Sequence, residues 1–241
     1  MSNNVFAFHK FKIQQDRCAM KVGTDGVLLG AWGQLEHHIL DIGCGSGLIS
    51  MMMVQRAWDE HIEDVSVVGI DIDADACSQA SENVEHSVFS DNISIHHISL
   101  QNFAGQMAAK SFDSIVSNPP FFINSLNSPD AKRSMARHAD ILNYRELFDG
   151  VSKLLTDNGV FSVIIPRECL DKFFSESVLH GFFIVRRCAI KTTQNKQPKR
   201  FLLSFSKHPM EAIDDSIEIL QNSDGTRSDW YHKLTESFYL R

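Results

Sequence analysis

The sequence predicts an α/β fold, a doubly wound and mostly parallel sheet of seven strands with an antiparallel last strand. Two observations support this prediction. From residue 37 onward, short apolar segments alternate with helical segments, which is typical of a parallel sheet with helices on both faces. The segments 182–190 and 200–206 have no helix between them, and this favours an antiparallel pair at the end of the sheet.

The seven expected strands are short, and most are rich in apolar or β-branched residues. They are residues 39–42, 65–71, 93–97, 112–117, 160–165, 182–190 and 200–206. Helices are expected at 46–58, after Asp73, at 143–155 and at 167–180. Asp73 can cap its helix, because a short carboxylate accepts hydrogen bonds from the N–H groups of the first helical turn.

The length of 241 residues fits one large domain with additions better than two domains. We predict a single domain in which residues 1–36 form an N-terminal cap segment and residues 37–207 form the catalytic core. Residues 208–241 are expected to be a C-terminal appendage, with one alternating stretch at 213–220 and an amphipathic helix at 228–239.

Composition narrows the class of protein. A hydrophobic content of 43% supports a full core, whereas the net charge of −7 means that a nucleic acid would need a local basic patch. Five cysteines without a CxxC pair indicate reduced thiols in a cytoplasmic protein, and neither a zinc site nor another metal site is expected. We also expect no signal peptide and no membrane partner, and nothing implies an oligomer.

Residues 41–47 read D-I-G-C-G-S-G and join the first strand of the core to its first helix. Glycines at such a turn allow a tight backbone and the close approach of a ligand. Leu48 replaces the third glycine of a dinucleotide fingerprint, and Asp71 lies 28 positions beyond Gly43, further than that fingerprint expects. No Gly-Lys-Ser or Gly-Lys-Thr follows, which excludes a P-loop; a plain tight turn remains the alternative.

The tetrapeptide Asn118-Pro119-Pro120-Phe121 follows the fourth strand. The Asn118 side-chain carbonyl and the Pro119 main-chain carbonyl could accept hydrogen bonds from a conjugated amine and so free its delocalised lone pair. Phe121 offers a face on which a base can stack. We predict Asn118, Pro119, Pro120 and Phe121 as the catalytic residues, with a rigid surface turn as the alternative.

The glycine loop, Asp71 and the Asn-Pro-Pro-Phe loop, in this order over roughly residues 37–206, resemble the class I methyltransferases that use S-adenosylmethionine. The resemblance implies that the glycine loop lies beside the methionine part of this cofactor and that Asp71 binds its ribose. It also implies that the Asn-Pro-Pro-Phe loop holds the target amine and that S-adenosylhomocysteine is the product.

Residues 18–32 (C-A-M-K-V-G-T-D-G-V-L-L-G-A-W), 118–122 and 230–240 are similar to the bacterial tRNA1(Val) adenine-37 N6-methyltransferases. This resemblance implies methyl transfer to N6 of an adenine in tRNA, with a short helix from Thr24 folded over the cofactor. The implied cofactor-binding residues are Lys21, Thr24, Asp41, Gly43, Cys44, Gly45, Gly47, Asp71, Ile72, Ser99, Leu100 and Asn118. The family usually has an acidic residue where Ser99-Leu100 stand, so adenine binding is expected to differ here.

A basic rim is expected near the target loop. Residues 186–207 hold seven basic residues and no acidic one, and three more basic residues follow the Pro-Pro loop. The predicted RNA-binding residues are Lys132, Arg133, Arg137, Arg186, Lys196, Lys199 and Arg200. The alternative is that these charges are simply solvated.

Three other functions remain open. Protein glutamine N5-methyltransferases share the Asn-Pro-Pro-aromatic loop but carry a helical N-terminal domain, and about 36 residues precede the first core strand here. Ribosomal-RNA guanine N2-methyltransferases also share it, but they are usually longer, duplicated chains. An inactive RNA-binding module would not require intact Gly43, Asp71 and Asn118.

Overall fold

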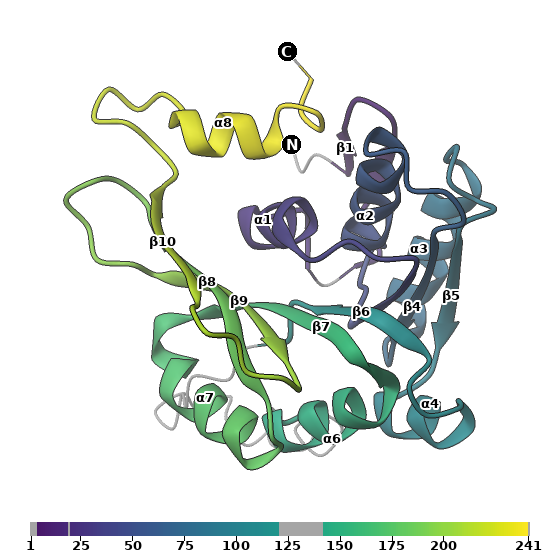
Figure 1. Ribbon diagram of the computed structural model, residues 1–241. Coiled ribbons are helices and arrows are strands. Elements are labelled where there is room, and N and C mark those ends of the chain that lie inside the picture. Colours follow the sequence, from purple (N-terminus) through teal and green to yellow (C-terminus); the bar gives the residue numbers. More distant parts are fainter. Residues whose placement is uncertain (1–3, 19, 121–141, 241) are drawn as a thin grey trace, which may run out of the picture.

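The computed structural model describes residues 4–18, 20–120 and 142–240. Its main sheet has the strand order β10-β8-β9-β7-β6-β3-β4-β5 (Figure 1). The strands are β3 (His38–Ile42), β4 (Ser66–Asp71), β5 (Ile93–His97), β6 (Phe112–Ser117), β7 (Leu155–Pro166), β8 (Phe183–Lys191), β9 (Arg200–Ser206) and β10 (Asp214–Ile219). All neighbours pair in parallel except β9, which is antiparallel to both β7 and β8. The predicted fold class is confirmed.

The sheet has eight strands rather than the seven expected. The additional strand is β10, from the segment assigned to the C-terminal appendage, and it lies parallel to β8 at the edge of the sheet. Its register is reinforced by ion pairs of Arg186 with Asp214 and of Arg187 with Asp215. The alternation in residues 213–220 indicates a strand, but it carries no information about a partner 28 residues earlier in the chain.

Helices cover both faces of the sheet (Figure 1). On one face lie α1 (Thr24–Trp32), α2 (Leu48–Asp59), α3 (Ala74–Glu85) and α8 (Asp229–Thr235); on the other lie α4 (Leu100–Gln106), α6 (Tyr144–Leu154) and α7 (Leu170–Leu179), preceded by η2 (Arg167–Cys169). Neighbouring residues of β3 divide between the two layers, since Ile39 packs with the first group and Leu40 with the second.

A short hairpin of β1 (Val5–Ala7) and β2 (Lys12–Gln14) precedes the core and was not predicted. Phe8 pairs with Tyr239 in an isolated bridge, and the two rings stack 5.9 Å apart, so the hairpin is joined to the C-terminal segment. Three-residue strands are too short for alternation to be recognised in a sequence. Their position is fixed instead by these contacts with distant residues.

The parallel strands bring the candidate site together at one edge of the sheet. β3, β4, β5, β6 and β7 run in the same direction, so their carboxyl ends meet there. Ile42 at the end of β3 pairs with Ile70 of β4 and with Ser117 of β6. The residues that follow these strands are therefore close in space although they are far apart in sequence.

The close packing of α6 against α4 depends on the absence of a side chain at Gly150. A Cβ at Gly150 would lie 2.6 Å from Cγ of Leu100, whereas a Cβ at Gly105 on α4 would meet nothing within 4 Å. We expect Gly150→Ala to lower the free energy of unfolding by about 1–3 kcal/mol. Gly105→Ala is the matched control and should raise it by about 0.5–1 kcal/mol, since alanine favours the helix. Urea unfolding of both variants tests this, and equal stabilities would contradict it.

Candidate active site

The turn after β3 is open on its outer side. Gly43, Gly45 and Gly47 have φ values of +74°, +53° and +79°, a region that favours glycine. The N–H groups of Gly43 and Cys44 donate to the carbonyl of Ile70 at 2.8 and 3.0 Å, which fixes the turn to β4. A Cβ added to Gly43 or Gly45 would meet nothing within 4 Å, so a ligand can approach this backbone closely.

Gly47 has a different role from the first two glycines. A Cβ at this position would lie 3.4 Å from Cβ of Ala80 on α3. This glycine therefore allows α2 to begin close against α3, and its contacts are with the protein rather than with open space. Of the three glycines, Gly43 and Gly45 are the two whose backbone faces a potential ligand.

Asp71 ends β4 and fixes the geometry beside the turn. Its Oδ2 accepts from the N–H of Gly45 at 2.9 Å, and its Oδ1 accepts from the N–H of Asp73 at 3.0 Å. Asp73 in turn caps α3 by accepting from the N–H groups of Asp75 and Ala76, as expected. Each carboxylate oxygen of Asp71 keeps a lone pair, so the group can still accept hydrogen bonds from hydroxyls of a ligand.

Asp41 lies fully buried beneath the turn. Its Oδ2 accepts from the N–H and Oγ–H of Ser50 at 3.1 and 2.7 Å, whereas its Oδ1 has no hydrogen-bond partner within the described residues. Burial raises the pKa of Asp41 to about 7, the charge of Asp71 adds to this, and the Ser50 hydrogen bonds oppose it. Burial also raises the pKa of the neighbouring Cys44 thiol, which keeps it neutral.

Asn118 follows β6 directly and presents an acceptor that the described fold leaves unused. Its Oδ1 is buried and has no hydrogen-bond partner in the described part of the chain. Ser117 fixes the end of β6 by donating from Oγ to the carbonyl of Ile42 at 2.8 Å. Pro119 is buried and Pro120 is exposed, while Phe121 lies outside the described residues. A buried acceptor without a donor costs about 1–3 kcal/mol, which a ligand N–H could recover.

The first helix lies with its start near the glycine turn. A Cβ at Gly26 on α1 would be 3.0 Å from Leu48, the first residue of α2. Thr24 is exposed at the start of α1, and Lys21 is exposed just before it. Asp25 in the first turn pairs with Arg200 of β9 at 2.7 Å.

The remaining predicted cofactor residues follow β4 and β5. Ile72 is 50% exposed, so its side chain is available to an apolar ligand surface. Ser99 caps α4 by accepting from the N–H of Asn102 at 3.3 Å. Leu100 is buried and packs against Gly150, so its side chain belongs to the core and only its backbone is left for a ligand.

The predicted RNA-binding residues differ in their surroundings. Lys132, Arg133 and Arg137 lie outside the described residues. Arg186 stacks over the Trp32 ring at 4.0 Å and donates to the Trp32 carbonyl, so it supports the end of α1. Lys196 and Lys199 are exposed at the β8–β9 connection.

Two residues of α2 that support this site carry no signal in the sequence. Arg56 on α2 donates to the carbonyls of Gly30 and Gly33 at 3.1 and 2.8 Å and so holds the end of α1. Burial lowers the pKa of Arg56 to about 10. Ser50 supports Asp41, as described above. Nothing in the local pattern around Arg56 or Ser50 could have revealed these partners, because both contacts depend on how the helices pack.

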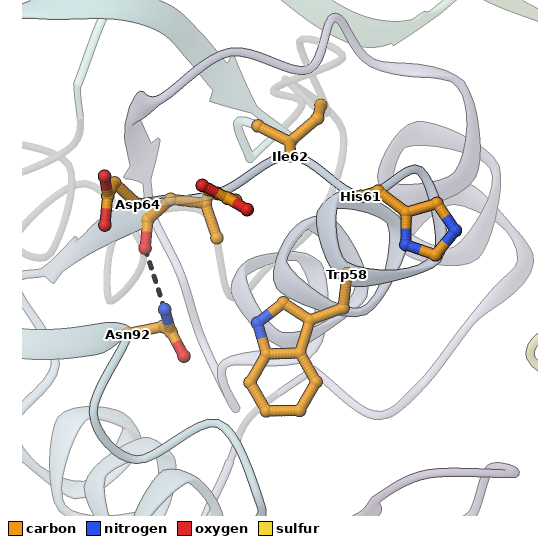
Figure 2. A pocket seen from close by; sticks show the side chains of 7 residues that line it. Trp58, His61, Ile62, Asp64 and Asn92 are labelled. Carbon is orange, nitrogen blue, oxygen red and sulfur yellow. Dashed lines mark hydrogen bonds between the residues drawn. The ribbon is translucent and has the colours of Figure 1, made fainter.

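Figure 2 shows a hollow elsewhere in the molecule, lined by residues that include Trp58, His61, Ile62, Asp64 and Asn92. These residues precede β4 and β5, so the hollow lies at the amino ends of the strands, away from the candidate site. Within residues 4–18, 20–120 and 142–240, no group of three or more His, Cys, Asp or Glu side chains could hold a metal ion. No helix in those same ranges is long and apolar enough to cross a membrane.

This fold, with the glycine turn, Asp71 and Asn118 at the carboxyl edge of the sheet, is typical of the class I methyltransferases. A family model described as "Methyltransferase domain" matches residues 35–223. Among solved structures, a predicted O-methyltransferase from Agrobacterium tumefaciens superposes with a TM-score of 0.70 at 14% identity, covering 89% of this chain and 96% of its own. A putative class I S-adenosylmethionine-dependent methyltransferase from Listeria monocytogenes superposes with a TM-score of 0.55 at 12% identity, covering 79% and 61%.

Relatives that are similar in sequence identify the family within this class of methyltransferases. A tRNA1(Val) (adenine(37)-N6)-methyltransferase from Bacteroides fragilis is 40% identical over 100% of both chains. A protein of the same name from Phocaeicola vulgatus is 41% identical, and the match covers 100% of this chain and 99% of that protein. One from Citrobacter koseri is 34% identical, and the match covers 100% of this chain and 96% of that protein. The chain belongs to the family of tRNA1(Val) (adenine(37)-N6)-methyltransferases, as the sequence resemblance implied.

The buried carboxyl group of Asp41 predicts a pH-dependent stability. Because its folded pKa is raised from 3.8 to about 7, its contribution is full below pH 4 and is lost as the pH rises through 7. Asp41→Asn cannot ionise, so the wild type should lose stability relative to this variant between pH 4 and 8, by up to about 4 kcal/mol. Urea unfolding without added cofactor measures this, with exposed Asp91→Asn as control. A pH-independent difference would contradict the assignment.

Proposed function

We propose that this chain transfers a methyl group from S-adenosylmethionine to N6 of an adenine in tRNA, with adenine 37 of tRNA1(Val) as its target and S-adenosylhomocysteine as product. The buried Oδ1 of Asn118, which has no hydrogen-bond partner among the described residues, is the observation that carries this proposal, since it is an acceptor ready for an amino group. The relatives named for this activity align over the whole chain, which favours it over the alternatives.

The residues around the glycine turn fit S-adenosylmethionine. The open space over Gly43 and Gly45 can receive the methionine part, and the lone pairs of Asp71 can accept from ribose hydroxyls. Exposed Ile72 and the cap residue Ser99 would flank the adenine ring. Lys21 and Thr24 would approach from the start of α1. The cofactor, when bound, supplies a methyl group on a sulfonium, which is already an excellent leaving group.

The protein's own residues would act on the amine rather than on the methyl group. Asn118 Oδ1 and the Pro119 carbonyl would accept from the two N–H groups and draw the nitrogen toward tetrahedral geometry. Pro119 and Pro120 would fix the direction of the Asn118 side chain, because their φ angles are restricted. Phe121 would stack on the base, worth roughly 1–3 kcal/mol. No strong base is needed, since the nitrogen loses its proton after it becomes cationic.

The tRNA would contact basic residues at the carboxyl edge of the sheet. Lys196 and Lys199 are exposed there, and the further candidates are Lys132, Arg133 and Arg137. In this view residues 1–36 act as a cap over the cofactor, residues 37–207 form the catalytic core and residues 208–241 support it. The chain would work in the cytoplasm, where tRNA is modified.

Each of the three alternative functions would give a different methylated product, or none. A ribosomal-RNA guanine N2-methyltransferase would label guanosine, and a protein glutamine N5-methyltransferase would label protein. An inactive RNA-binding module would fail to bind the cofactor. Methyl transfer from labelled S-adenosylmethionine to unmodified tRNA pools, followed by mapping of the labelled nucleoside, separates these outcomes. Label in N6-methyladenosine at position 37 is the result that we expect.

Asn118 offers the sharpest test of the mechanism. We expect Asn118→Ala to lower kcat on the order of 10²–10³-fold, by analogy with the loss of one transition-state hydrogen bond. Its affinity for S-adenosylmethionine should stay within a few-fold of the wild type. Asn118→Asp keeps an acceptor oxygen on a side chain of similar shape and should lose less activity than the alanine variant.

Single-turnover methylation and calorimetric titration of the cofactor provide the two readouts for Asn118. Robust turnover by Asn118→Ala would refute the role assigned to this side chain. A large loss of cofactor affinity in the same variant would instead indicate a structural effect at the end of β6.

A further inference from the structure

All three arginines of the basic run 186–207 are already paired with carboxylates. The pairs are Arg186 with Asp214, Arg187 with Asp215, and Arg200 with Asp25. A phosphate that bound one of these guanidinium groups would have to compete with its carboxylate partner. The number of basic residues in this run therefore overstates the charge available to a polyanion.

Two cations at the carboxyl edge differ from these arginines. Arg167 is the first residue after β7, and Lys199 directly precedes β9; both are exposed. Neither side chain makes an ion pair or hydrogen bond with any residue in the described ranges. Arg167 lies outside the basic run, so sequence inspection did not single it out.

The backbone holds these two residues together. The N–H of Arg167 donates to the carbonyl of Lys199 at 3.1 Å, and Pro166 pairs with Arg200 in the β7–β9 ladder. The guanidinium of Arg200 donates to the same Lys199 carbonyl at 3.1 Å. Two long cationic side chains thus start from neighbouring, fixed backbone positions and can converge on a single anion.

Their position relative to Asn118 follows from the strand register. Ser117 of β6 pairs with Val163 of β7, so Arg167 begins one strand away and a few residues beyond Asn118. At the usual strand spacing and rise, this separates the two backbones by roughly 10 Å. A flexible arginine side chain can span much of that distance. This is the scale of a base and the sugar that links it to its phosphate.

We propose that Arg167 and Lys199 form a phosphate-binding pair that holds the RNA backbone beside the target nucleotide. The proposal rests on the proposed function, because it requires that Asn118 holds a base of an RNA. Glu168 and Asp171 are exposed on the following turn and lower the local positive potential. Both cations are therefore needed to hold the phosphate.

The test is RNA binding by the full chain as a function of salt. The probe is an unmodified transcript of the target tRNA, with S-adenosylhomocysteine present. We expect Arg167→Gln to weaken binding roughly tenfold at low salt and to make the log–log salt dependence shallower by about 0.7–0.9. The double variant Arg167→Gln with Lys199→Gln should roughly double this change in slope.

Lys153→Gln is the matched control, since this exposed lysine lies at the end of α6, before β7 begins, at the opposite edge of the sheet. It should keep wild-type affinity and slope, and all variants should keep wild-type affinity for S-adenosylhomocysteine. If the Arg167 and Lys199 variants behave like Lys153→Gln while the wild type methylates the transcript, the phosphate-binding pair is refuted and the function stands. If the wild type neither binds nor methylates it, both proposals fail.

Discussion

The site depends on side-chain oxygens that can accept hydrogen bonds. Parallel strands bring these oxygens to the carboxyl edge of the sheet, where some of them receive no hydrogen bond from the described residues. Asp41 and Asp71 lie on β3 and β4, and Asn118 directly follows the adjacent β6; main-chain pairing fixes the register of these three strands. One oxygen of Asp41 and the Oδ1 of Asn118 have no hydrogen-bond donor in the described part of the protein. A buried acceptor without a donor costs about 1–3 kcal/mol, and the extensive apolar layers on both faces of the sheet offset this cost.

The first helix is held at both of its ends by arginines from other elements. Its end is held by Arg56 of α2 and Arg186 of β8, and its first turn is held by the pair of Asp25 with Arg200 of β9. Of the arginines that a sequence would assign to RNA, Arg186 and Arg200 therefore also keep α1 over the glycine turn. A change at either residue is expected to disturb cofactor and RNA together, and this distinguishes both arginines from the phosphate-binding pair of Arg167 and Lys199.

The local sequence pattern was sufficient to predict an element where that element depends mainly on its own residues. The bounds of β5, β6 and β9 and the Asp73 cap agree with prediction, because short apolar runs and a short carboxylate act locally. The pairing of β10, the docking of the β1–β2 hairpin and the Arg56 contacts were not predictable, since each depends on a partner far along the chain. For the site, the sequence indicated the residue types, but it could not show that the Leu100 side chain is committed to the core.

An acidic chain can still be selective for a polyanion if its free cations are few and fixed. The net charge of −7 opposes indiscriminate attraction of RNA, so affinity has to come from positions where cations lack carboxylate partners. Among the described residues Arg167 and Lys199 meet this condition, and their backbones are joined by a hydrogen bond. Because non-specific binding grows with the number of phosphates neutralised, a small rigid set of contacts favours one docking position over many. This arrangement would present one nucleotide to Asn118 while most of the RNA surface remains unbound.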